Sequence, residues 1–437
     1  MSKFDNMRLL KIGIVVLLGM TLTGCGGETS TSSSQTLNFS EDNGGITLPD
    51  NFQAVVVADS VGQARHVTVA ENGDIYIALE EEKNGGSIAA LRDEDGDGTA
   101  DQVEYFGSYA GTGIQLHDGY LYSSSDTSVV RYTMEENQLV PRGEAEIVVE
   151  GFPDQDSHAA KSFTFDGSGN LYVNVGGPSN ACQEEGRTPE SPGMDPCPQL
   201  ENHGGVWQFD ANTTGQSFEE DGERYTTGIR NSVALDWNEN AGKLYIVQHG
   251  RDQLNTLWPD YYTVEDNAEL PAEEMFAVDE GDNFGWPYTY YDGLTGQKMI
   301  APEYGGDGET AYEGDEYEDP IITFPAHWAP NDLIFYSGTQ YPDHYSSGAF
   351  IAFHGSWNRA PEPQQGYNVT FVPFDGAEVD GEYEVFADGF AGQDSLSSPG
   401  NAEARPTGLA SGADGSLYVT DSQKGKVWRI VYTGDEE

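Results

Sequence analysis

One histidine in this sequence stands where it could do acid–base chemistry. His158 lies in the segment Asp156–Lys161, directly before a stretch that has the pattern of a strand. Histidine is the natural general base near neutral pH, because its usual pKa lies close to the working pH. His158 is therefore the candidate base, and a solvated loop histidine is the alternative.

Arginines are few in this chain, and several stand at the start or exit of predicted strand pairs: Arg65, Arg230, Arg251, Arg359 and Arg405. Guanidinium groups gathered at one rim of an acidic protein predict a local binding site for an anion. The stretch Gly228–Gln253 has the alternation and the turn of a hairpin, and its polar ends, Arg230–Asn231 and His249–Asp252, are expected at the same rim.

A further polar segment, His354–Arg359, follows the apolar strand Ala349–Phe353. Trp357, Asn358 and Arg359 together suit stacking on, and paired hydrogen bonds to, a planar anionic ligand. A tryptophan packed between neighbouring sheets would give the same pattern. The sequence has no P-loop, GxSxG, HExxH or CxxCH motif, so nucleotide, hydrolase-triad and c-type haem functions lack support.

A strand–turn–strand unit recurs along the chain and would position these residues. Its clearer copies are Ala64–Ala78, Lys161–Val175, Asn231–Val247 and Arg405–Asp421, and its weaker copies are Thr112–Asp126 and Ala326–Gly338. Six sheet units of unequal length predict an all-β six-bladed propeller, with a pair of β-sandwiches as the alternative. The lone strand Phe52–Asp59 is expected to close the ring by pairing with Lys426–Tyr432.

Acidic stretches rich in glycine and proline interrupt the repeat and are predicted as rim loops: Gln183–Pro198, Asp260–Gly281 and Tyr304–Asp319. Cys182 and Cys197 flank or lie in the first of these loops. An exported protein meets oxidising conditions, so these cysteines are predicted to form a disulfide that pins the loop.

The charge balance is strongly acidic, with Asp+Glu 74 against Lys+Arg 20 and a formal net charge of -54. Such a surface repels DNA, RNA and anionic lipid headgroups, which argues against a nucleic-acid partner. Salt would screen the self-repulsion, so the composition suggests a halophilic or marine source.

The first residues have the pattern of a targeting segment. Basic residues precede a short apolar run, Ile12–Leu18, and Leu22–Cys25 resembles a bacterial lipobox. The resemblance implies a signal peptide over residues 1–24, lipidation of Cys25 and a tether to residue 47. The chain would then be anchored to a membrane, facing the periplasm or the cell surface. Gly26 favours the outer membrane, and an ordinary cleaved signal is the alternative.

An acidic loop matches the spacing of a calcium loop, through Asp93, Asp95, Asp97 and Glu104. Carboxylates at alternate positions can converge on one hard cation, and Gly98 and its neighbours allow a sharp turn. Strands are expected on both sides, so this is not an EF-hand. The pattern predicts a structural calcium, and an acidic hairpin turn is the alternative.

Several motifs together resemble the pyrroloquinoline quinone (PQQ)-dependent soluble sugar dehydrogenases of the glucose/sorbosone type, and most closely the sorbosone dehydrogenase-like branch. The resemblance covers about Leu48 to Thr433. It rests on Arg230–Asn231, Gln248–Asp252, Phe284–Pro287, Phe324–Trp328 and His354–Arg359.

The resemblance implies one propeller domain over residues 48–434 that holds PQQ beside Ca2+ above its central channel. It implies His158 as catalytic base, Gly250 and Arg251 as calcium ligands through their backbone carbonyls, and these contacts to PQQ: Arg65, Arg230, Asn231 and Arg405. The glucose enzymes have a second arginine where Thr407 stands. They use a lysine where this chain has His354, Trp357, Asn358 and Arg359, and the choice among these four stays open.

The expected function is oxidation of an aldose, or a related sugar or aldehyde, to a lactone or acid, with electrons passed to an external quinone or cytochrome. A calcium-dependent propeller lactonase is one alternative; it would hold calcium by side-chain carboxylates in the channel. A non-catalytic propeller that binds a glycan or a partner protein is the other. The fold alone does not separate them.

Overall fold

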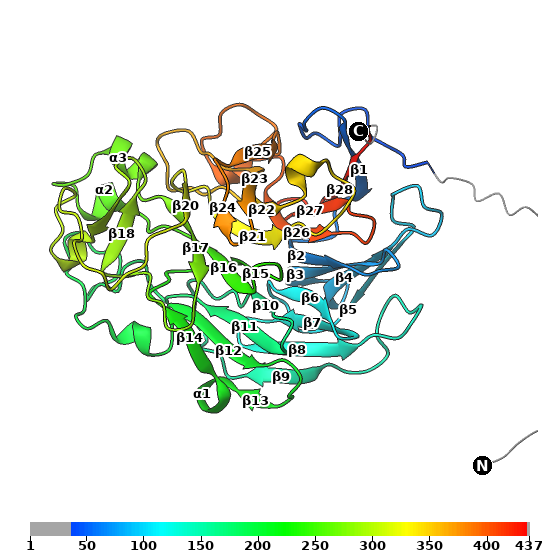
Figure 1. The fold of residues 1–437 in the computed structure, drawn as a ribbon, viewed down its shortest axis with the longest axis horizontal. Helices are drawn as coiled ribbons and strands as arrows, with labels where there is room; N and C mark the ends of the chain where they lie inside the picture. Colours follow the sequence, from blue (N-terminus) through cyan, green and yellow to red (C-terminus); the bar gives the residue numbers. More distant parts are fainter. Residues whose placement is uncertain (1–35, 435–437) are drawn as a thin grey trace, which may run out of the picture. The chain divides into compact units, whose positions relative to one another are not determined.

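In the computed structural model, which describes residues 36–434, six sheets stand around a common centre (Figure 1). The innermost strand of each sheet lies beside the innermost strands of the sheets next to it, so the ring is closed. The predicted six-bladed propeller is therefore confirmed. The signal peptide and Cys25 lie outside the described residues.

The first three blades follow one another along the chain. Blade one contains β2 (Ala64–Val69), β3 (Ile75–Lys83), β4 (Gly86–Arg92) and β5 (Gln102–Phe106). Blade two contains β6 (Ile114–His117), β7 (Tyr120–Ser124), β8 (Ser128–Thr133) and β9 (Glu146–Glu150), with β13 (Gln216–Ser217) added parallel to β9. Blade three contains β10 (Phe163–Phe165), β11 (Asn170–Val175), β12 (Gly205–Asp210) and β14 (Glu223–Thr227).

The remaining blades carry the long connections. Blade four contains β15 (Ala234–Asn238), β16 (Lys243–Gln248), β17 (Glu273–Val278) and β20 (Ile322–Phe324). Blade five contains β21 (Pro330–Phe335), β22 (Gly348–Phe353), β23 (Asn368–Asp375), β24 (Glu378–Val379) and β25 (Glu384–Ala387). Blade six contains β26 (Pro406–Ser411), β27 (Leu417–Asp421), β28 (Val427–Tyr432) and the early strand β1 (Phe52–Ala58).

The ring closes through β1, as predicted. This strand pairs antiparallel with β28, in a register that runs from Phe52 opposite Tyr432 to Val56 opposite Trp428. A strand from the start of the chain thus completes the last blade and ties the ends of the described chain together.

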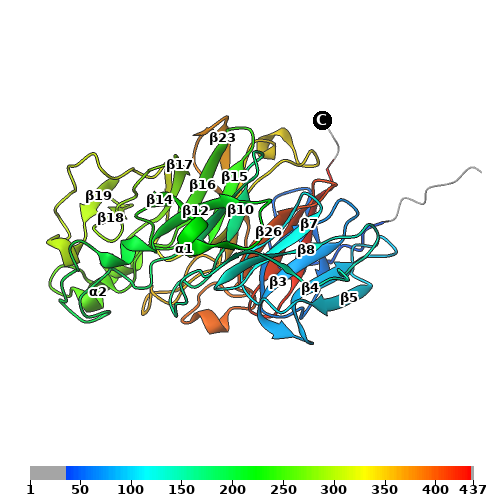
Figure 2. The ribbon, with the colours of Figure 1, turned by 90° about the horizontal axis from the view of Figure 1, so that it is seen from below.

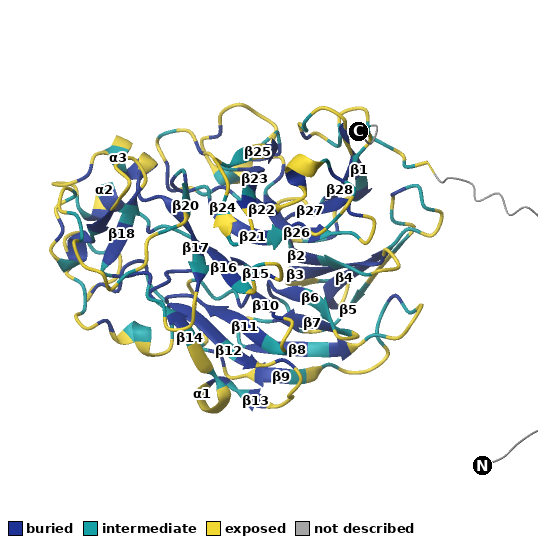
Figure 3. Cartoon of the chain, viewed as in Figure 1, coloured by how far each residue is buried: buried dark blue, intermediate teal, exposed yellow. Residues whose placement is uncertain are grey.

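Six core clusters lie at the six interfaces between neighbouring blades. The strands are mostly buried, while most exposed residues lie in the connecting loops and at the outer strands (Figure 3). Because each sheet packs on both faces, its strands carry apolar residues on both sides, as in the Val-Val-Val run of β1. Burial between blades therefore fixes the position of each inner strand, and with it the residues at the strand ends.

The structure corrects two details of the predicted repeat. The copy at Ala326–Gly338 contains only β21, because its partner β22 comes after a longer connection. The stretch Asp260–Gly281 is not wholly a rim loop, because it contains β17, the buried third strand of blade four. Its acidic residues Glu273 and Glu274 hid this strand, but both are buried.

Short helices and one further hairpin occur in the connections. They are α1 (Phe218–Asp221), α2 (Leu254–Leu257), α3 (Val264–Glu269), and β18 (Thr289–Asp292) paired with β19 (Gln297–Ile300). α2, the β18–β19 hairpin and the residues on either side of α3 share a small core of their own. α2, β18 and β19 lie together at one edge of the propeller (Figure 2), and α3 lies beside α2 (Figure 1). Among residues 36–434, no helix is long and apolar enough to cross a membrane.

The predicted disulfide is confirmed. Cys182 and Cys197 are bonded and pin the loop between β11 and β12. Gly193 of this loop packs against Tyr304 of the blade-four insertion, so the disulfide holds a loop that contacts a second insertion.

Candidate active site

Antiparallel strand pairs bring the predicted polar residues to one face of the propeller. A residue before an inner strand and a residue after the second strand lie at the same end of their blade. This end carries three histidines and three arginines, which we call the central cluster: His158, His249, His354, Arg65, Arg230 and Arg405. Burial is the main cause that lowers the pKa values of all three histidines, and the positive charge of at least one of the three arginines lowers each of them further.

His158 has the form of a neutral base. Burial and the neighbouring Arg230 lower the pKa of His158 to about 3, so the ring is uncharged at neutral pH. Its Nδ1 lies 2.5 Å from the carbonyl oxygen of Gly177. A neutral imidazole must donate from Nδ1 to this carbonyl, which leaves the lone pair on Nε2. Nε2 has no hydrogen-bond partner among residues 36–434 and can accept a proton from a ligand.

The backbone around His158 is built for this position. His158 has φ 56°, in the left-handed region that costs a non-glycine residue free energy. The end of β11 lies against it: a Cβ on Gly176 would stand 2.6 Å from the His158 Cβ. A Cβ on Gly177 would stand 2.4 Å from Trp286. Only glycine fits at both positions.

Arg230 is held at the centre by a buried network. Its guanidinium donates to the backbone oxygen of Asn180 at 3.2 Å, to the Asn180 side chain at 3.1 Å and to Asp252 at 3.0 Å. Burial acts to raise the pKa of Asp252, but Arg230 and Arg187 outweigh it and the pKa falls to about 2. The network fixes the guanidinium and leaves its Nη1 without a hydrogen bond from the described residues.

Arg405 and Arg65 lie on the opposite side of the central cluster. Arg405 donates to the carbonyl oxygens of His354, at 3.0 Å, and of Gly355. Arg65 donates to Thr112 at 3.3 Å and lies 3.8 Å from Glu80. Nη1 of Arg405 and Nη2 of Arg65 donate no hydrogen bond to the described residues. Three arginines thus each keep one terminal N–H group for a ligand.

The segment His354–Arg359 divides in two. His354 belongs to the central cluster, with Nε2 2.7 Å from Ser422 Oγ. Arg359 is buried elsewhere, where it donates to Glu269 at 2.7 Å and to the carbonyl of Ala268. The structure therefore brings His354 to the centre and does not bring Arg359 there.

The other two candidates of that segment also lie apart from the central cluster. Asn358 is buried, and its backbone oxygen accepts from Asn267 at 2.8 Å. Trp357 is 51% exposed. Asn231, by contrast, is buried beside the base: its Oδ1 lies 3.3 Å from Asn174 Nδ2, and a Cβ on Gly176 would approach it.

The loop after β16 presents two unused carbonyl groups. The backbone oxygens of Gly250 and Arg251 accept no hydrogen bond from residues 36–434. The Arg251 side chain points away and pairs with Glu303 in the blade-four insertion. Glu273 holds the loop: it accepts from Gly250 N at 2.7 Å and from Ala329 N at 3.0 Å. Carbonyl oxygens are ligands that Ca2+ favours, so this loop could supply two of them.

A scan against protein-family models matches the TrAA12-like family over residues 46–433. The chain belongs to the TrAA12-like family. At the level of the protein family, the resemblance to PQQ-dependent sugar dehydrogenases is confirmed.

Two curated relatives match parts of this TrAA12-like chain. A pyrroloquinoline quinone-dependent pyranose dehydrogenase of Coprinopsis cinerea is 28% identical over 235 residues, 46% of the chain and 30% of the relative. An uncharacterized protein of Borreliella burgdorferi is 30% identical over 207 residues, 47% of the chain and 48% of the relative. The chain thus matches less than half the length of either relative.

Solved structures share the fold over nearly the whole described chain. A Trichoderma reesei Carbohydrate-Active Enzymes Family AA12 structure has a TM-score of 0.70 at 17% identity and covers 91% of the chain and 99% of its own. The PQQ domain of the Coprinopsis cinerea pyranose dehydrogenase has a TM-score of 0.67 at 18% identity, with coverage of 91% and 98%.

The structure explains why Thr407 cannot replace an arginine. Thr407 is fully buried, and its hydroxyl donates to the carbonyl oxygen of Arg405 at 2.9 Å. It therefore steadies Arg405 and presents no group to a ligand. Arg405 and Arg65 are therefore the two arginines of the central cluster on the side opposite Arg230.

The predicted calcium loop has a different set of carboxylates. Ligand atoms of Asp93, Asp95 and Asp101 lie within 4.8 Å of one another. Glu104 instead lies on β5, opposite Ala90, and Asp97 accepts from Thr99 N at 2.8 Å. The structure thus brings Asp101, not Glu104, to Asp93 and Asp95. A structural calcium here stays a prediction.

Sequence reasoning did not predict Asn180 or Glu273 as residues that position the site, and it placed Asp252 at the rim without its role of holding Arg230. Asp252 ends the predicted hairpin segment, and its role could have been predicted. A carboxylate beside several arginines can fix the position of one guanidinium group through an ion pair. Asn180 lies in a loop without pattern, and Glu273 looked like a solvated acid. No local signal marks either one.

Proposed function

We propose that this chain is a PQQ-dependent dehydrogenase that oxidises a sugar or a related aldehyde. The single observation that carries the proposal is the central cluster: a neutral His158 with an unused Nε2, enclosed by three arginines that each keep a terminal N–H group. Two comparisons support the proposal: the match to the TrAA12-like family and the similarity to a PQQ-dependent pyranose dehydrogenase.

The residues present fit the cofactor. PQQ carries three carboxylates, and Arg65, Arg230 and Arg405 are the matching cations in a chain whose net charge is -54. The carbonyl oxygens of Gly250 and Arg251 suit the calcium that accompanies it. These residues would hold PQQ and Ca2+ over the centre of the ring.

His158 would take the proton from the anomeric hydroxyl of the sugar through Nε2. Its Nδ1–H stays on the Gly177 carbonyl and keeps the ring in the required tautomer throughout. When bound, PQQ supplies the hydride acceptor, and the oxidised product would be a lactone or acid. Arg230, fixed by Asp252 and Asn180, would stabilise negative charge that develops near it.

The lactonase alternative would require calcium held by carboxylates in the channel. The channel does contain Asp236 and Asp332, but each already accepts backbone N–H groups of the inner strands. No observation favours the non-catalytic alternative over the dehydrogenase, since a binding module has no use for a strained neutral histidine.

The lipobox-like segment and the acidic composition are the basis for a proposal about where in the cell the protein lies. We infer that the chain is anchored through Cys25 to a bacterial membrane and faces the periplasm or the cell surface, in a saline setting. An external quinone or cytochrome would take the electrons. Labelling with a radioactive fatty acid, lost in Cys25→Ser, would test the anchor.

The test of function is reconstitution. The purified full chain is mixed with PQQ and Ca2+, singly and together, and dye reduction is followed with a panel of aldoses, pyranoses and sorbosone. We expect reduction only when both are added. Failure of PQQ to bind at all, measured by its absorbance after gel filtration, would leave only the scaffold in common with the dehydrogenases.

A further inference from the structure

The segment that carries His158 is not held by strand pairing. It lies between β9 and β10, and the backbone carbonyl oxygens of residues 157–160 accept no backbone N–H group from residues 36–434. His158 nevertheless keeps φ at 56°, in a region that a non-glycine residue adopts only when its surroundings enforce it. Side chains must therefore fix this backbone.

A side-chain nitrogen donates to each of the four carbonyl groups. Gln155 Nε2 lies 2.6 Å from the Ser157 oxygen and 3.1 Å from the His158 oxygen. The donors to the next two carbonyl groups are Lys161 Nζ, at 2.5 Å from the Ala159 oxygen, and Asn174 Nδ2, at 3.3 Å from the Ala160 oxygen.

Gln155 makes one further contact, and it reaches across to blade three. Its Nε2 also lies 3.0 Å from the carbonyl oxygen of Gly176, directly after β11. All three neighbours of this atom are acceptors, which identifies it as the amide nitrogen, with two N–H groups shared among three oxygens. Gln155 Oε1 accepts no hydrogen bond from residues 36–434, so the amide serves here as a donor.

The imidazole of His158 binds the carbonyl group next along the chain. Its Nδ1 donates to Gly177, while Gln155 binds Gly176 and the backbone of His158 itself. The tautomer of a neutral histidine is set by the hydrogen bond that one of its ring nitrogens makes. If the His158 segment and the end of β11 moved apart, the hydrogen on Nδ1 would lose its partner and could move to Nε2, the atom that must accept a proton.

From this geometry we propose that Gln155 is a positioning residue, which fixes the backbone and the tautomer of His158 by joining its segment to the end of β11. That this matters for catalysis rests on the proposed function. The effect on the tautomer does not.

The test compares two glutamines that each donate to three carbonyl groups. Gln155→Met keeps the length of the side chain and removes the donor. Gln216→Met is the control: Gln216 Nε2 lies 2.8 Å from the Asp210 and Thr213 oxygens and 3.5 Å from the Val148 oxygen. Gln216 is buried in β13, the outermost strand of blade two. Both variants should lower Tm, and only Gln155→Met should change His158.

The tautomer is measured by NMR on the full chain without added cofactor, labelled with ¹⁵N-histidine. Comparison with His158→Asn identifies the His158 signals among those of eight histidines. In wild type and in Gln216→Met we expect a protonated Nδ1 and an unprotonated Nε2. In Gln155→Met the two ¹⁵N shifts should move toward each other as the tautomers mix. Unchanged shifts in Gln155→Met, or the same change in Gln216→Met, would overturn the proposal.

Gln155→Glu provides a second variant of nearly the same shape, which decides the question if Gln155→Met does not fold. A protonated carboxyl group donates one hydrogen bond and a carboxylate donates none. With wild type at both pH values as the reference, we expect mixed tautomers at pH 8 and signals closer to the wild-type pattern at pH 5. A wild-type pattern at both pH values would mean that no donor is needed at this position, and the proposal would be wrong.

Dye reduction by the PQQ-loaded enzyme then measures the consequence for catalysis. We expect kcat to fall about 10- to 100-fold in Gln155→Met, as a misplaced reacting group does, with KM and the Kd for PQQ within about threefold of wild type. Weaker PQQ binding with unchanged kcat would instead assign Gln155 to the cofactor site and contradict the proposal. If wild type itself reduces no dye, the proposed function fails, and the NMR result still decides the role of Gln155.

Discussion

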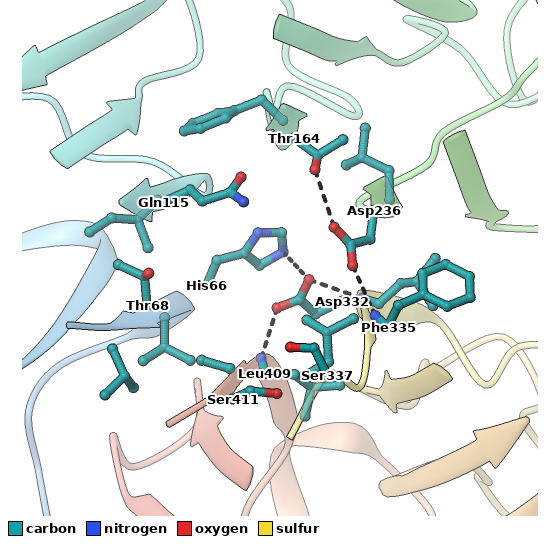
Figure 4. A pocket seen from close by; sticks show the side chains of 18 residues that line it. His66, Thr68, Gln115, Thr164, Asp236, Asp332, Phe335, Ser337, Leu409 and Ser411 are labelled. Atoms are coloured by element: carbon teal, nitrogen blue, oxygen red, sulfur yellow. Dashed lines mark hydrogen bonds and ion pairs between the residues drawn. The ribbon is translucent and has the colours of Figure 1, made fainter. Parts of the chain in front are cut away.

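Two groups of buried ionisable side chains lie at the centre of the same ring, and they differ in what their polar atoms do. The central cluster lies at the strand ends. The other group, which we call the channel trio, lines a cavity of about 200 Å³ between the inner strands: His66, Asp236 and Asp332 (Figure 4). Burial shifts the pKa values of both groups.

The channel trio joins blades to one another. His66 of blade one donates to the Asn331 carbonyl of blade five at 2.7 Å. Asp332 accepts from Leu409 N of blade six at 2.7 Å. Asp236 of blade four accepts from Phe335 N of blade five at 2.9 Å. The inner strands of neighbouring blades are not paired with one another. Each of these side chains therefore supplies a hydrogen-bond partner for a backbone group that has none in its own sheet.

His66 Nε2 and Asp332 Oδ1 lie 3.7 Å apart, close enough for an ion pair if the imidazole is protonated. Burial lowers the pKa of His66 to about 4 and raises the pKa of Asp332 well above its usual value. A shifted pKa therefore marks burial in both groups. Unused donors and acceptors distinguish the central cluster, and they are the better sign of a site.

The largest effect should come from the base. His158→Asn removes the proton acceptor, while asparagine tolerates the left-handed backbone and its Nδ2 can still donate to the Gly177 carbonyl. We expect kcat for dye reduction to fall about 10²- to 10⁴-fold with PQQ still bound. Stopped-flow kinetics with PQQ and Ca2+ added would measure it.

The matched change in the channel trio is His66→Gln, which can keep the bond to the Asn331 carbonyl. It should lower stability and leave kcat per folded molecule within about twofold of wild type. Equal losses of kcat in the two variants would mean that the channel trio belongs to the reaction and that the comparison fails.

Arg405 and Arg359, both predicted from the sequence as contacts to PQQ, provide the second contrast. Arg405→Gln removes a guanidinium that faces the centre, and we expect the Kd for PQQ to rise about 10- to 100-fold, the effect of losing a charged hydrogen bond. Arg359→Gln should leave that Kd unchanged. It should instead lower the free energy of unfolding by about 1–3 kcal/mol, because the Ala268 and Pro363 carbonyls lose their donor.

Fluorescence titration of PQQ and urea unfolding would measure the two quantities separately. The opposite pattern, with PQQ binding sensitive to Arg359 and not to Arg405, would show that the cofactor lies toward the α3 insertion.

Glu273 should have a smaller effect, through the calcium loop. Glu273→Gln keeps one carbonyl acceptor but replaces the other oxygen with an amide that faces Gly250 N–H or Ala329 N–H. The loop would lose its orientation, and we expect Ca2+ affinity to fall about tenfold, as is usual when a ligand's support is removed. Ca2+ titration of PQQ-dependent activity, together with calorimetry, would show it. An unchanged Ca2+ affinity would place the ion away from Gly250 and Arg251.

The sequence predicted the ring well because its signals are local. Apolar strands with Gly/Asn turns recur wherever two inner strands of a blade meet, and the residues at their ends follow from the antiparallel pairing. β17 was not predicted as a strand, because Glu273 and Glu274 interrupt its apolar pattern. Both side chains are nevertheless buried and form hydrogen bonds inside the protein. The role of Arg359 was also beyond reach, because its partner Glu269 comes from another blade's insertion. A contact between segments that lie far apart in the chain produces no repeating pattern in the sequence, so it could not be predicted.

The smallest effect on activity is expected from Asp236, where the change is one of pH dependence. Burial raises the pKa of Asp236 from 3.8 to about 7. Between about pH 4 and pH 7 the folded chain holds a proton that the unfolded chain has lost. The contribution of Asp236 to stability is therefore fully present below pH 4, is lost progressively as the pH rises to about 7, and changes no further above it. Asp236→Asn removes this titration. Its amide must face the Trp237 or the Phe335 N–H group, which lowers stability at every pH and leaves the slope as the readout.

We therefore expect the free energy of unfolding of wild type to fall more steeply between pH 4 and pH 7 than that of Asp236→Asn, by at most about 1.4 kcal/mol per pH unit. Glu273 and Glu274 also have pKa values raised to about 7, so both proteins should share the remaining slope. Urea unfolding at constant high salt would give both slopes, and kcat at pH 7 should not change. Identical slopes would mean that Asp236 is ionised in the fold and that the amide donors of Trp237 and Phe335 suffice to hold the charge. The channel would then resemble the central cluster as a place where the protein stabilises negative charge.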